Sequence, residues 1–305
     1  MRALLVDRSA PAGLRLGIAP DPEPAPDQAL VRVHATSVNP GDLGYEAAPE
    51  GTVPGYEAAG VIERAAADGS GPPVGTPVVT LDAHGGWAEL RAVGTTLIGT
   101  APRGADPGAL STVAVAGASA LRALRRVGPI LGRRVLITGA AGGVGRYAVQ
   151  LARLGGAQVI AAVRDPATHG SVLRSLGADE VVDNPATVTQ PVHGVIDTAG
   201  GTTLVEAYDR LAAHGVLVSV GPGTGETFPP MSFAGHAGRH ERTIVTFFNP
   251  EGAPMPADLT WLAEKVAGGA VDPGITARTG WDNAADAIRS LRERLVRGKV
   301  VLDIT

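Results

Sequence analysis

The fold of this chain is decided by the stretch VLITGAAGGVGR, residues 135–146. An apolar strand runs into a tight glycine turn, and an amphipathic stretch over residues 147–154 follows the turn. Glycines in such a turn let backbone N–H groups approach a pyrophosphate closely, and the next helix presents the positive end of its dipole to the negative charge. The stretch therefore predicts a dinucleotide site. Its expected phosphate-binding residues are Gly142, Gly143, Val144 and Gly145.

Around this turn, apolar runs alternate with stretches of helical periodicity. Strands are predicted at 134–138, 157–163, 180–183, 194–198, 215–220 and 242–247. Helices are predicted near 144–154, 168–176 and 201–213, each closed by a glycine, namely Gly155, Gly177 and Gly215, where a left-handed cap costs little. Strands joined by crossover helices form a doubly wound parallel sheet, so the fold class is α/β.

The first third of the chain has the pattern of β-structure instead. Strands are predicted at 3–6, 29–35, 60–64 and 77–81, whereas the proline-rich segment 19–27 is expected to be an extended surface connection. Residues 111–127, 258–266 and 283–294 have helical spacing. The final strand, 299–304, has no neighbour left in the parallel sheet and is expected to pair with the N-terminal strands. The predicted domains are therefore 1–112 with 254–305, and 113–253 between them.

Composition narrows the classes of partner. The net charge of −4 is small and the basic residues are scattered, which disfavours nucleic acid and anionic membranes. The absence of cysteine removes disulfides, thiolate metal ligands and thiol nucleophiles. No secretory apolar segment opens the chain, and no apolar run approaches the ~20 residues that span a bilayer. We expect a cytoplasmic protein that acts on a small molecule.

Four blocks of the sequence resemble the medium-chain dehydrogenase/reductase superfamily, in which such blocks occur in the same order along the chain. Residues 139–145, GAAGGVG, are similar to the A-A-x-G-G-V-G signature of its quinone oxidoreductase branch, with Gly139 replacing the first alanine. The others are ATSVNPGD at 35–42, PGYEAAG at 54–60 and RGKVVL at 297–302. The resemblance covers essentially the whole chain. It implies a Rossmann sheet inserted into a GroES-like β-domain.

The resemblance also bears on metal binding. Zinc-dependent members of the superfamily place a cysteine where Asn39 stands and a histidine where Tyr56 stands. Catalytic zinc needs about three protein ligands, and the structural zinc loop of those enzymes needs cysteines, so we expect no metal. Without a Lewis acid, oxidation of a simple alcohol is disfavoured. What remains is hydride delivery to a quinone or to a C=C bond conjugated to a carbonyl, as in an enone or enoyl thioester.

The residue after the second strand of the parallel sheet indicates which cofactor is bound. Arg164 stands there, and an arginine pairs well with the 2′-phosphate of NADP, whereas NAD sites usually carry a carboxylate. Asp165 follows, either as a ribose ligand or as a helix cap before Pro166. We favour NADPH.

Further cofactor contacts are expected at the carboxyl ends of strands and from the resemblance. The strand ends place Thr198, Ala199, Val220 and Gly221 beside the crevice of a doubly wound sheet. The resemblance adds Asn39, Ser119, Phe247, Phe248 and Arg294. Each addition has a structural alternative: a turn before Pro40 for Asn39, a helix cap for Ser119, interface packing for the phenylalanines, and a solvated helix face for Arg294.

Enone reduction also needs a proton, which relatives take from a tyrosine or from solvent. Tyr45 and Tyr56 are the candidates, with Asn39 as an orienting residue, although for each tyrosine a structural, hydrogen-bonded role is favoured over that of an obligatory acid. The sequence also allows an NADPH-binding sensor or structural protein with little catalysis. The family resemblance further implies a homodimer, joined through the edge strand at 241–248.

Overall fold

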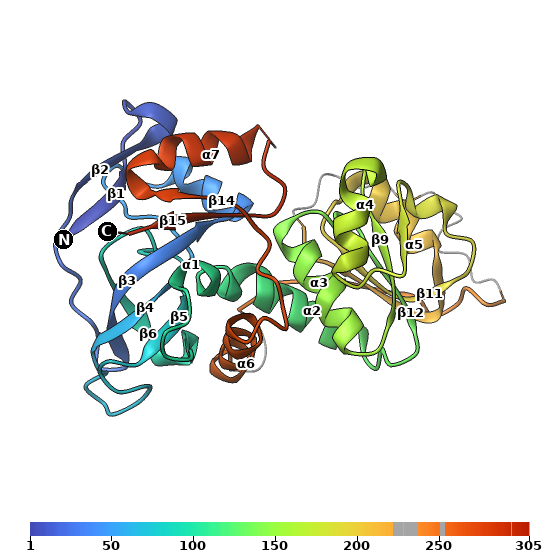
Figure 1. Cartoon of the computed structure of the whole chain (residues 1–305), viewed down its shortest axis with the longest axis horizontal. Helices are drawn as coiled ribbons and strands as arrows, with labels where there is room; N and C mark the ends of the chain where they lie inside the picture. The colour runs from blue at the N-terminus through green and yellow to red at the C-terminus, as the bar shows by residue number, and fades with distance from the viewer. Residues whose placement is uncertain (222–227, 229–236, 251–253, 294, 305) are drawn as a thin grey trace. The chain divides into compact units, whose positions relative to one another are not determined.

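The computed structural model describes residues 1–221, 228, 237–250, 254–293 and 295–304. The chain divides into two compact units, Met1–Ala118 with Gly252–Thr305, and Ser119–Glu251 (Figure 1). The first is called the β-unit and the second the nucleotide unit. No helix among the described residues is long and apolar enough to cross a membrane.

The nucleotide unit is built on a six-stranded sheet. Its spatial order is β10 (Glu180–Val182), β9 (Gln158–Ala162), β8 (Arg134–Ile137), β11 (Val192–Asp197), β12 (Leu211–Ser219) and β13 (Thr243–Thr246). Every neighbouring pair is parallel. The chain therefore winds outward from β8 in one direction, then returns to β11 and winds in the other. This confirms the predicted doubly wound sheet.

Three helices connect these strands: α3 (Gly143–Leu154), α4 (Pro166–Ser175) and α5 (Gly201–Asp209). A short 3-10 turn lies at Pro185–Thr187. The predicted helix 201–213 is wrong beyond Asp209, because Leu211 already pairs with Val192 and is buried in the core as part of β12.

Of the predicted glycine caps, Gly177 has a left-handed φ of +110° and follows Leu176, the C-cap of α4. The cap at Gly215 is wrong, since that residue lies inside β12. Gly155 ends α3 with a φ of −77°, and the left-handed residue is the next one, Gly156.

The β-unit contains a seven-stranded sheet and a separate antiparallel pair, β1 (Arg2–Val6) with β2 (Leu14–Ile18). The order of the larger sheet is β14 (Ile275–Gly280), β15 (Lys299–Asp303), β3 (Gln28–Val38), β4 (Glu57–Arg64), β5 (Pro77–Leu81) and β7 (Ile98–Thr100), with β6 (Leu90–Gly94) also paired to β3. As predicted, β15 returns to the N-terminal strands, antiparallel to β3. The sequence patterns did not predict β14, which pairs in parallel with β15.

Helices of the β-unit are short or peripheral: α1 (Pro107–Leu110), α6 (Pro256–Ala267), α7 (Ala284–Arg292), and 3-10 segments at Pro11–Gly13, Pro40–Ala47, Thr95–Leu97 and Trp281–Asn283. A π-helical segment, Val113–Gly117, leads directly into α2 (Ala118–Val127). The predicted helix over 111–127 therefore has two geometries. Trp87 and Trp281 are fully buried in the main core of the β-unit.

Candidate active site and cofactor-binding residues

The glycine turn after β8 has the geometry that a pyrophosphate requires. Gly139 has a φ of +59°, and the N–H of Gly142 donates to its carbonyl oxygen at 2.9 Å. A Cβ added to Gly145 would lie 2.5 Å from the Gly139 oxygen and 2.6 Å from Ala140 Cα, so only glycine allows the helix to start so close to the turn. The N–H groups of the first turn of α3, at Gly143, Val144 and Gly145, have no acceptor inside the helix. This cradle fits the phosphates of a dinucleotide.

The ends of β8 and β11 are linked beside this turn through buried side chains. The hydroxyl of Thr138 donates to Asp197 Oδ1 at 2.5 Å, and Asp197 Oδ2 accepts from the N–H of Gly200 at 3.0 Å. The hydroxyl of Thr198 donates to the Thr138 carbonyl at 2.8 Å. A Cβ on Gly221 would lie 2.8 Å from the Thr198 oxygen, so the end of β12 also approaches closely.

The predicted contacts Thr198, Ala199, Val220 and Gly221 thus lie at the carboxyl ends of β11 and β12. The strand order reverses between β8 and β11, which is where a doubly wound sheet opens its ligand crevice.

Arg164 and Asp165 follow β9 and have different roles in the structure. Asp165 is the N-cap of α4, with its carboxylate accepting from the N–H of Thr168 at 3.1 Å and from the Thr168 hydroxyl at 2.6 Å. These bonds lower the pKa of Asp165. The helix-cap alternative is therefore confirmed for this residue. Arg164 is exposed beside it, and its contact with a 2′-phosphate stays a prediction.

The remaining predicted cofactor residues fall in different settings. The N–H of Phe247 donates to the Ser219 carbonyl at 3.2 Å, and the Arg126 guanidinium lies 4.8 Å from its ring centre. Phe248 is exposed. Ser119 is buried inside a continuous helical segment and so does not cap a helix, because π-helical residues precede it. Arg294 lies outside the described residues.

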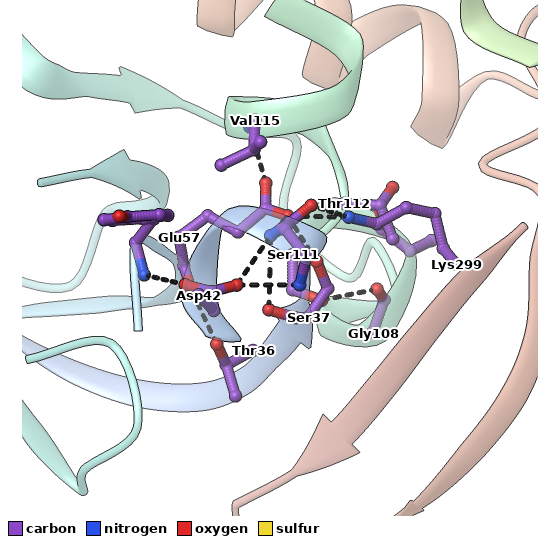
Figure 2. A network of polar contacts seen from close by, with 12 residues as sticks. Thr36, Ser37, Asp42, Glu57, Gly108, Ser111, Thr112, Val115 and Lys299 are labelled. Atoms are coloured by element: carbon purple, nitrogen blue, oxygen red, sulfur yellow. Dashed lines mark hydrogen bonds and ion pairs between the residues drawn. The ribbon is translucent and has the colours of Figure 1, made fainter. Parts of the chain in front are cut away.

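A buried polar network in the β-unit joins Asn39, Glu57 and Lys299. Figure 2 shows Glu57 and Lys299 within it. Glu57 begins β4, and its Oε1 accepts from Lys299 Nζ at 2.9 Å and from Asn39 Nδ2 at 2.9 Å. The same oxygen accepts a short hydrogen bond from the hydroxyl of Ser37. Glu57 Oε2 accepts from the N–H of Val115 at 2.6 Å. Four donors thus surround one carboxylate that has no exposed surface.

The amide of Asn39 is fully engaged inside this network. Its Oδ1 accepts from Lys299 Nζ at 2.5 Å, and its Nδ2 donates to both Glu57 and Asp42. Asn39 is also the N-cap of the 3-10 segment that begins at Pro40, as the turn alternative predicted. This geometry favours a positioning role over a direct contact with ribose or substrate.

Asp42 connects the network to Tyr56. Its Oδ2 accepts from the N–H of Asn39 at 2.7 Å, and its Oδ1 accepts from the N–H of Tyr56 at 2.9 Å. Burial raises the pKa of Asp42 to about 6, against the effect of these hydrogen bonds.

The two candidate tyrosines occupy opposite environments. Tyr45 packs edge-on against Trp87, its hydroxyl donates a short hydrogen bond to the Ala12 carbonyl, and Arg292 donates to it at 3.4 Å. Its contacts favour the structural alternative. Tyr56 is partly exposed, and no described residue hydrogen-bonds its hydroxyl. Burial raises the pKa of both phenols, and the charge of Asp42 adds to the effect on Tyr56.

Lys299 and Arg91 are the residues that sequence reasoning missed. Lys299 stands in the C-terminal block RGKVVL. This block indicated the family, but it predicted no role for the lysine side chain. Arg91 lies on β6 and is 1% exposed, although nothing in the sequence of a short strand marks an arginine as buried.

Metal ligands do not gather in the described ranges, where no three His, Cys, Asp or Glu side chains are placed to share an ion. Asn39 and Tyr56 stand where the zinc-dependent relatives have ligands, and the ammonium of Lys299 lies against Asn39 and Glu57. A metal cation beside that ammonium would be repelled.

Two family models match this chain. Residues 25–125 match the family model described as "Alcohol dehydrogenase GroES-like domain", and residues 176–302 match "Zinc-binding dehydrogenase". An acryloyl-coenzyme A reductase of Sulfurisphaera tokodaii is 30% identical over 262 residues, which cover 72% of this chain and 77% of that protein. A chloroplast envelope quinone oxidoreductase homolog of Arabidopsis thaliana is 29% identical over 70% of this chain and 71% of its own.

Among solved structures, the quinone oxidoreductase of Thermus thermophilus, which was also determined in complex with NADPH, superposes with a TM-score of 0.82. It is 28% identical, and the match covers 99% of this chain and all of that chain.

Proposed function

Because this chain belongs to the medium-chain dehydrogenase/reductase superfamily, in its zinc-independent branch, we propose that it reduces quinones or activated C=C bonds with NADPH. One observation carries the choice of substrate class. Asn39 and Tyr56 stand at two positions where the zinc-dependent enzymes place ligands. Asn39 is hydrogen-bonded to the ammonium of Lys299 and to Glu57, and Tyr56 carries a phenol. These groups suit an acceptor that is already electrophilic, such as a quinone, an enone or an enoyl thioester.

The residues of the nucleotide unit fit a dinucleotide. The N–H groups of Gly142, Gly143, Val144 and Gly145 would bind the pyrophosphate. Thr198, Ala199, Val220 and Gly221 would line the crevice beyond the strand ends. When bound, the reduced nicotinamide supplies a hydride to the acceptor. Ser119, Phe247, Phe248 and Arg294 are proposed as further contacts to the cofactor.

The NADPH preference rests on Arg164. This residue is exposed and lies two positions after β9, and the neighbouring carboxylate of Asp165 is engaged in capping α4. Replacing Arg164 with alanine should weaken NADPH binding about 10- to 100-fold, the loss of one charge-assisted interaction, and leave NADH nearly unchanged. Arg153→Ala is the matched control, because that exposed arginine pairs with Asp179 instead. Equal losses for both cofactors in titration calorimetry would contradict the assignment.

Turnover separates the reductase from a cofactor-binding sensor or structural protein. NADPH absorbance should fall when the enzyme meets members of a panel of quinones, enones and enoyl thioesters. Tight NADPH binding without oxidation by any member would favour the sensor.

We assign the proton donor to Tyr56 and not to Tyr45. The hydroxyl of Tyr45 is engaged by Ala12 and Arg292, whereas that of Tyr56 has no partner among the described residues. A raised pKa keeps the phenol of Tyr56 protonated at neutral pH, as an acid requires. Asn39 would hold this region in place.

Assembly and location complete the proposal. β13 is an edge strand of the parallel sheet, and pairing of two such edges would give a homodimer. We propose the cytoplasm as its location. Light scattering should then give twice the 30.8 kDa mass of the chain. A monomer mass would contradict the dimer.

A further inference from the structure

Two buried charged side chains bind the main chain of Tyr56, one at its N–H and the other at its carbonyl. We propose that Asp42 and Arg91 are positioning residues that fix Tyr56 for proton delivery. This inference rests on the proposed function, in which Tyr56 donates the proton.

Arg91 binds the main-chain carbonyl of Tyr56. Its Nη2 donates to the Tyr56 carbonyl at 2.8 Å and to the His84 carbonyl at 2.8 Å, and its Nε donates to the same His84 oxygen at 3.1 Å. Its Nη1 donates to the Thr80 hydroxyl at 3.0 Å. These acceptors are neutral, and most of them are main-chain carbonyls, so the buried guanidinium mainly fixes main-chain positions. Burial lowers the pKa of Arg91 only to about 10, and the group remains charged at neutral pH.

Asp42 binds the main-chain N–H of Tyr56. Its three hydrogen bonds come from the N–H of Tyr56 and from the N–H and side-chain amide of Asn39. Because all of these partners are donors, the carboxylate has one favourable orientation. Asn39 is in turn held by Glu57 and Lys299. The position of Tyr56 is thus linked through hydrogen bonds to the terminal strand β15.

The ring of Tyr56 is confined as well. A Cβ built on Gly41 would lie 3.1 Å from Tyr56 Cε2, so the ring packs closely on the backbone there. Backbone and ring are held by the protein, while the described residues offer the hydroxyl no partner. A tyrosine whose backbone and ring are fixed, and whose hydroxyl has no partner in the described part of the chain, is suited to donate its proton to a bound substrate.

The chemistry requires such control. After a conjugated carbonyl had gained a hydride at its β-carbon, the electron pair of its C=C bond would lie in an enolate, and the α-carbon would then take a proton. Tyr56 Oη–H would supply that proton, and water would reprotonate the resulting phenolate. Small displacements of a reacting group cost large factors in rate.

A double-mutant cycle tests whether Arg91 acts through Tyr56. Arg91→Lys keeps the charge but loses the planar fork, and should lower kcat about 10-fold. Tyr56→Phe should lower kcat about 100-fold. If the two act as a unit, the double variant should be no slower than Tyr56→Phe alone. Losses that multiply would overturn the proposal. In Tyr208→Phe, a control in the nucleotide unit, Arg91→Lys should cost its full factor.

A second measurement does not require turnover. The chain has four tyrosines, and 3-fluorotyrosine labelling gives each a ¹⁹F resonance, with that of Tyr56 assigned by its loss in Tyr56→Phe. In the cofactor-free protein, Arg91→Lys and Asp42→Asn should each move or broaden the Tyr56 signal and leave those of Tyr147 and Tyr208 in place.

The two outcomes distinguish the hypotheses. An unchanged Tyr56 signal in both variants would overturn the positioning role. Absence of turnover in the unmodified enzyme, with the signal still responding, would overturn the proposed function and the proton delivery by Tyr56, and would leave the fixing of Tyr56 by Asp42 and Arg91 standing. If Arg91→Lys does not fold, Asp42→Asn replaces it in the double-mutant cycle and in the ¹⁹F measurement.

Discussion

Replacing Lys299 with methionine should destabilise the β-unit strongly. The ammonium lies 2.9 Å from Glu57 Oε1, and the two side chains are 3% and 0% exposed. Methionine retains the apolar stem and removes the charge. Glu57 is then buried with only neutral donors, from Ser37, Asn39 and Val115.

The expected magnitude follows from these contacts. Removing one partner of a buried ion pair costs about 3–5 kcal/mol, and the three remaining donors place the loss near the lower end, about 3 kcal/mol. The unpaired oxygen of Asn39 adds about 1 kcal/mol. The β-unit has 172 residues, 118 from Met1–Ala118 and 54 from Gly252–Thr305. For a unit of this size, a total of about 4 kcal/mol lowers Tm by roughly 8–16 °C.

Calorimetry and urea unfolding measure this loss. Arg278→Met is the control, because that arginine pairs with Asp106 and Asp303 at a partly exposed site and should cost about 1 kcal/mol or less. The double variant Lys299→Met with Glu57→Gln should recover part of the loss, since the buried charge is gone. A loss below about 1 kcal/mol for Lys299→Met would refute the reasoning.

Three further predictions concern single residues. In Gly145→Ala, the new Cβ meets the Gly139 carbonyl at 2.5 Å, so affinity for both NADPH and NADH should fall at least about 10-fold in titration calorimetry, and unchanged affinity would count against the phosphate cradle. Asp42 has a pKa raised to about 6 in the folded chain, so the folded state binds its proton more tightly. Lowering the pH from 7 to 4.5 should therefore stabilise the wild type relative to Asp42→Asn by about 2 kcal/mol in urea unfolding, and a change of opposite sign would contradict the burial of this carboxyl. Asp165→Ala removes the cap to Thr168 and should cost about 1 kcal/mol of stability without changing the NADPH to NADH ratio; a switch in that ratio would show a ribose contact.

Sequence patterns predicted those parts of the fold that depend on residues close together in the chain. Gly145 is required because the backbone at Gly139 and Ala140, a few residues earlier, approaches it closely, and the apolar runs of the parallel strands reflect burial on both faces. The return of β15 to β3 followed from counting which strands lacked a neighbour. β14 was missed because its residues, ITARTG, alternate only weakly and become a strand by pairing with β15.

The candidate site depended more on contacts between distant residues. Asn39, Asp42 and Tyr56 stood in recognisable blocks, but the partner that organises them, Lys299, is 260 positions from Asn39 in the chain. No periodicity in the sequence connects these positions. Arg91 shows the same limit, since only the fold brings its guanidinium to the Tyr56 carbonyl.

Hydride transfer from NADPH to an electrophilic acceptor is tested most directly with cofactor deuterated at C4 of the nicotinamide. Single-turnover oxidation should be followed with each of the two C4-deuterated epimers and a quinone or enone that reacts. Oxidation should be slowed several-fold with one epimer only, and an enone product should carry that deuterium at its β-carbon. NADPH that binds but is oxidised by no acceptor, or is oxidised without an isotope effect from either epimer, would contradict a hydride-transferring reductase.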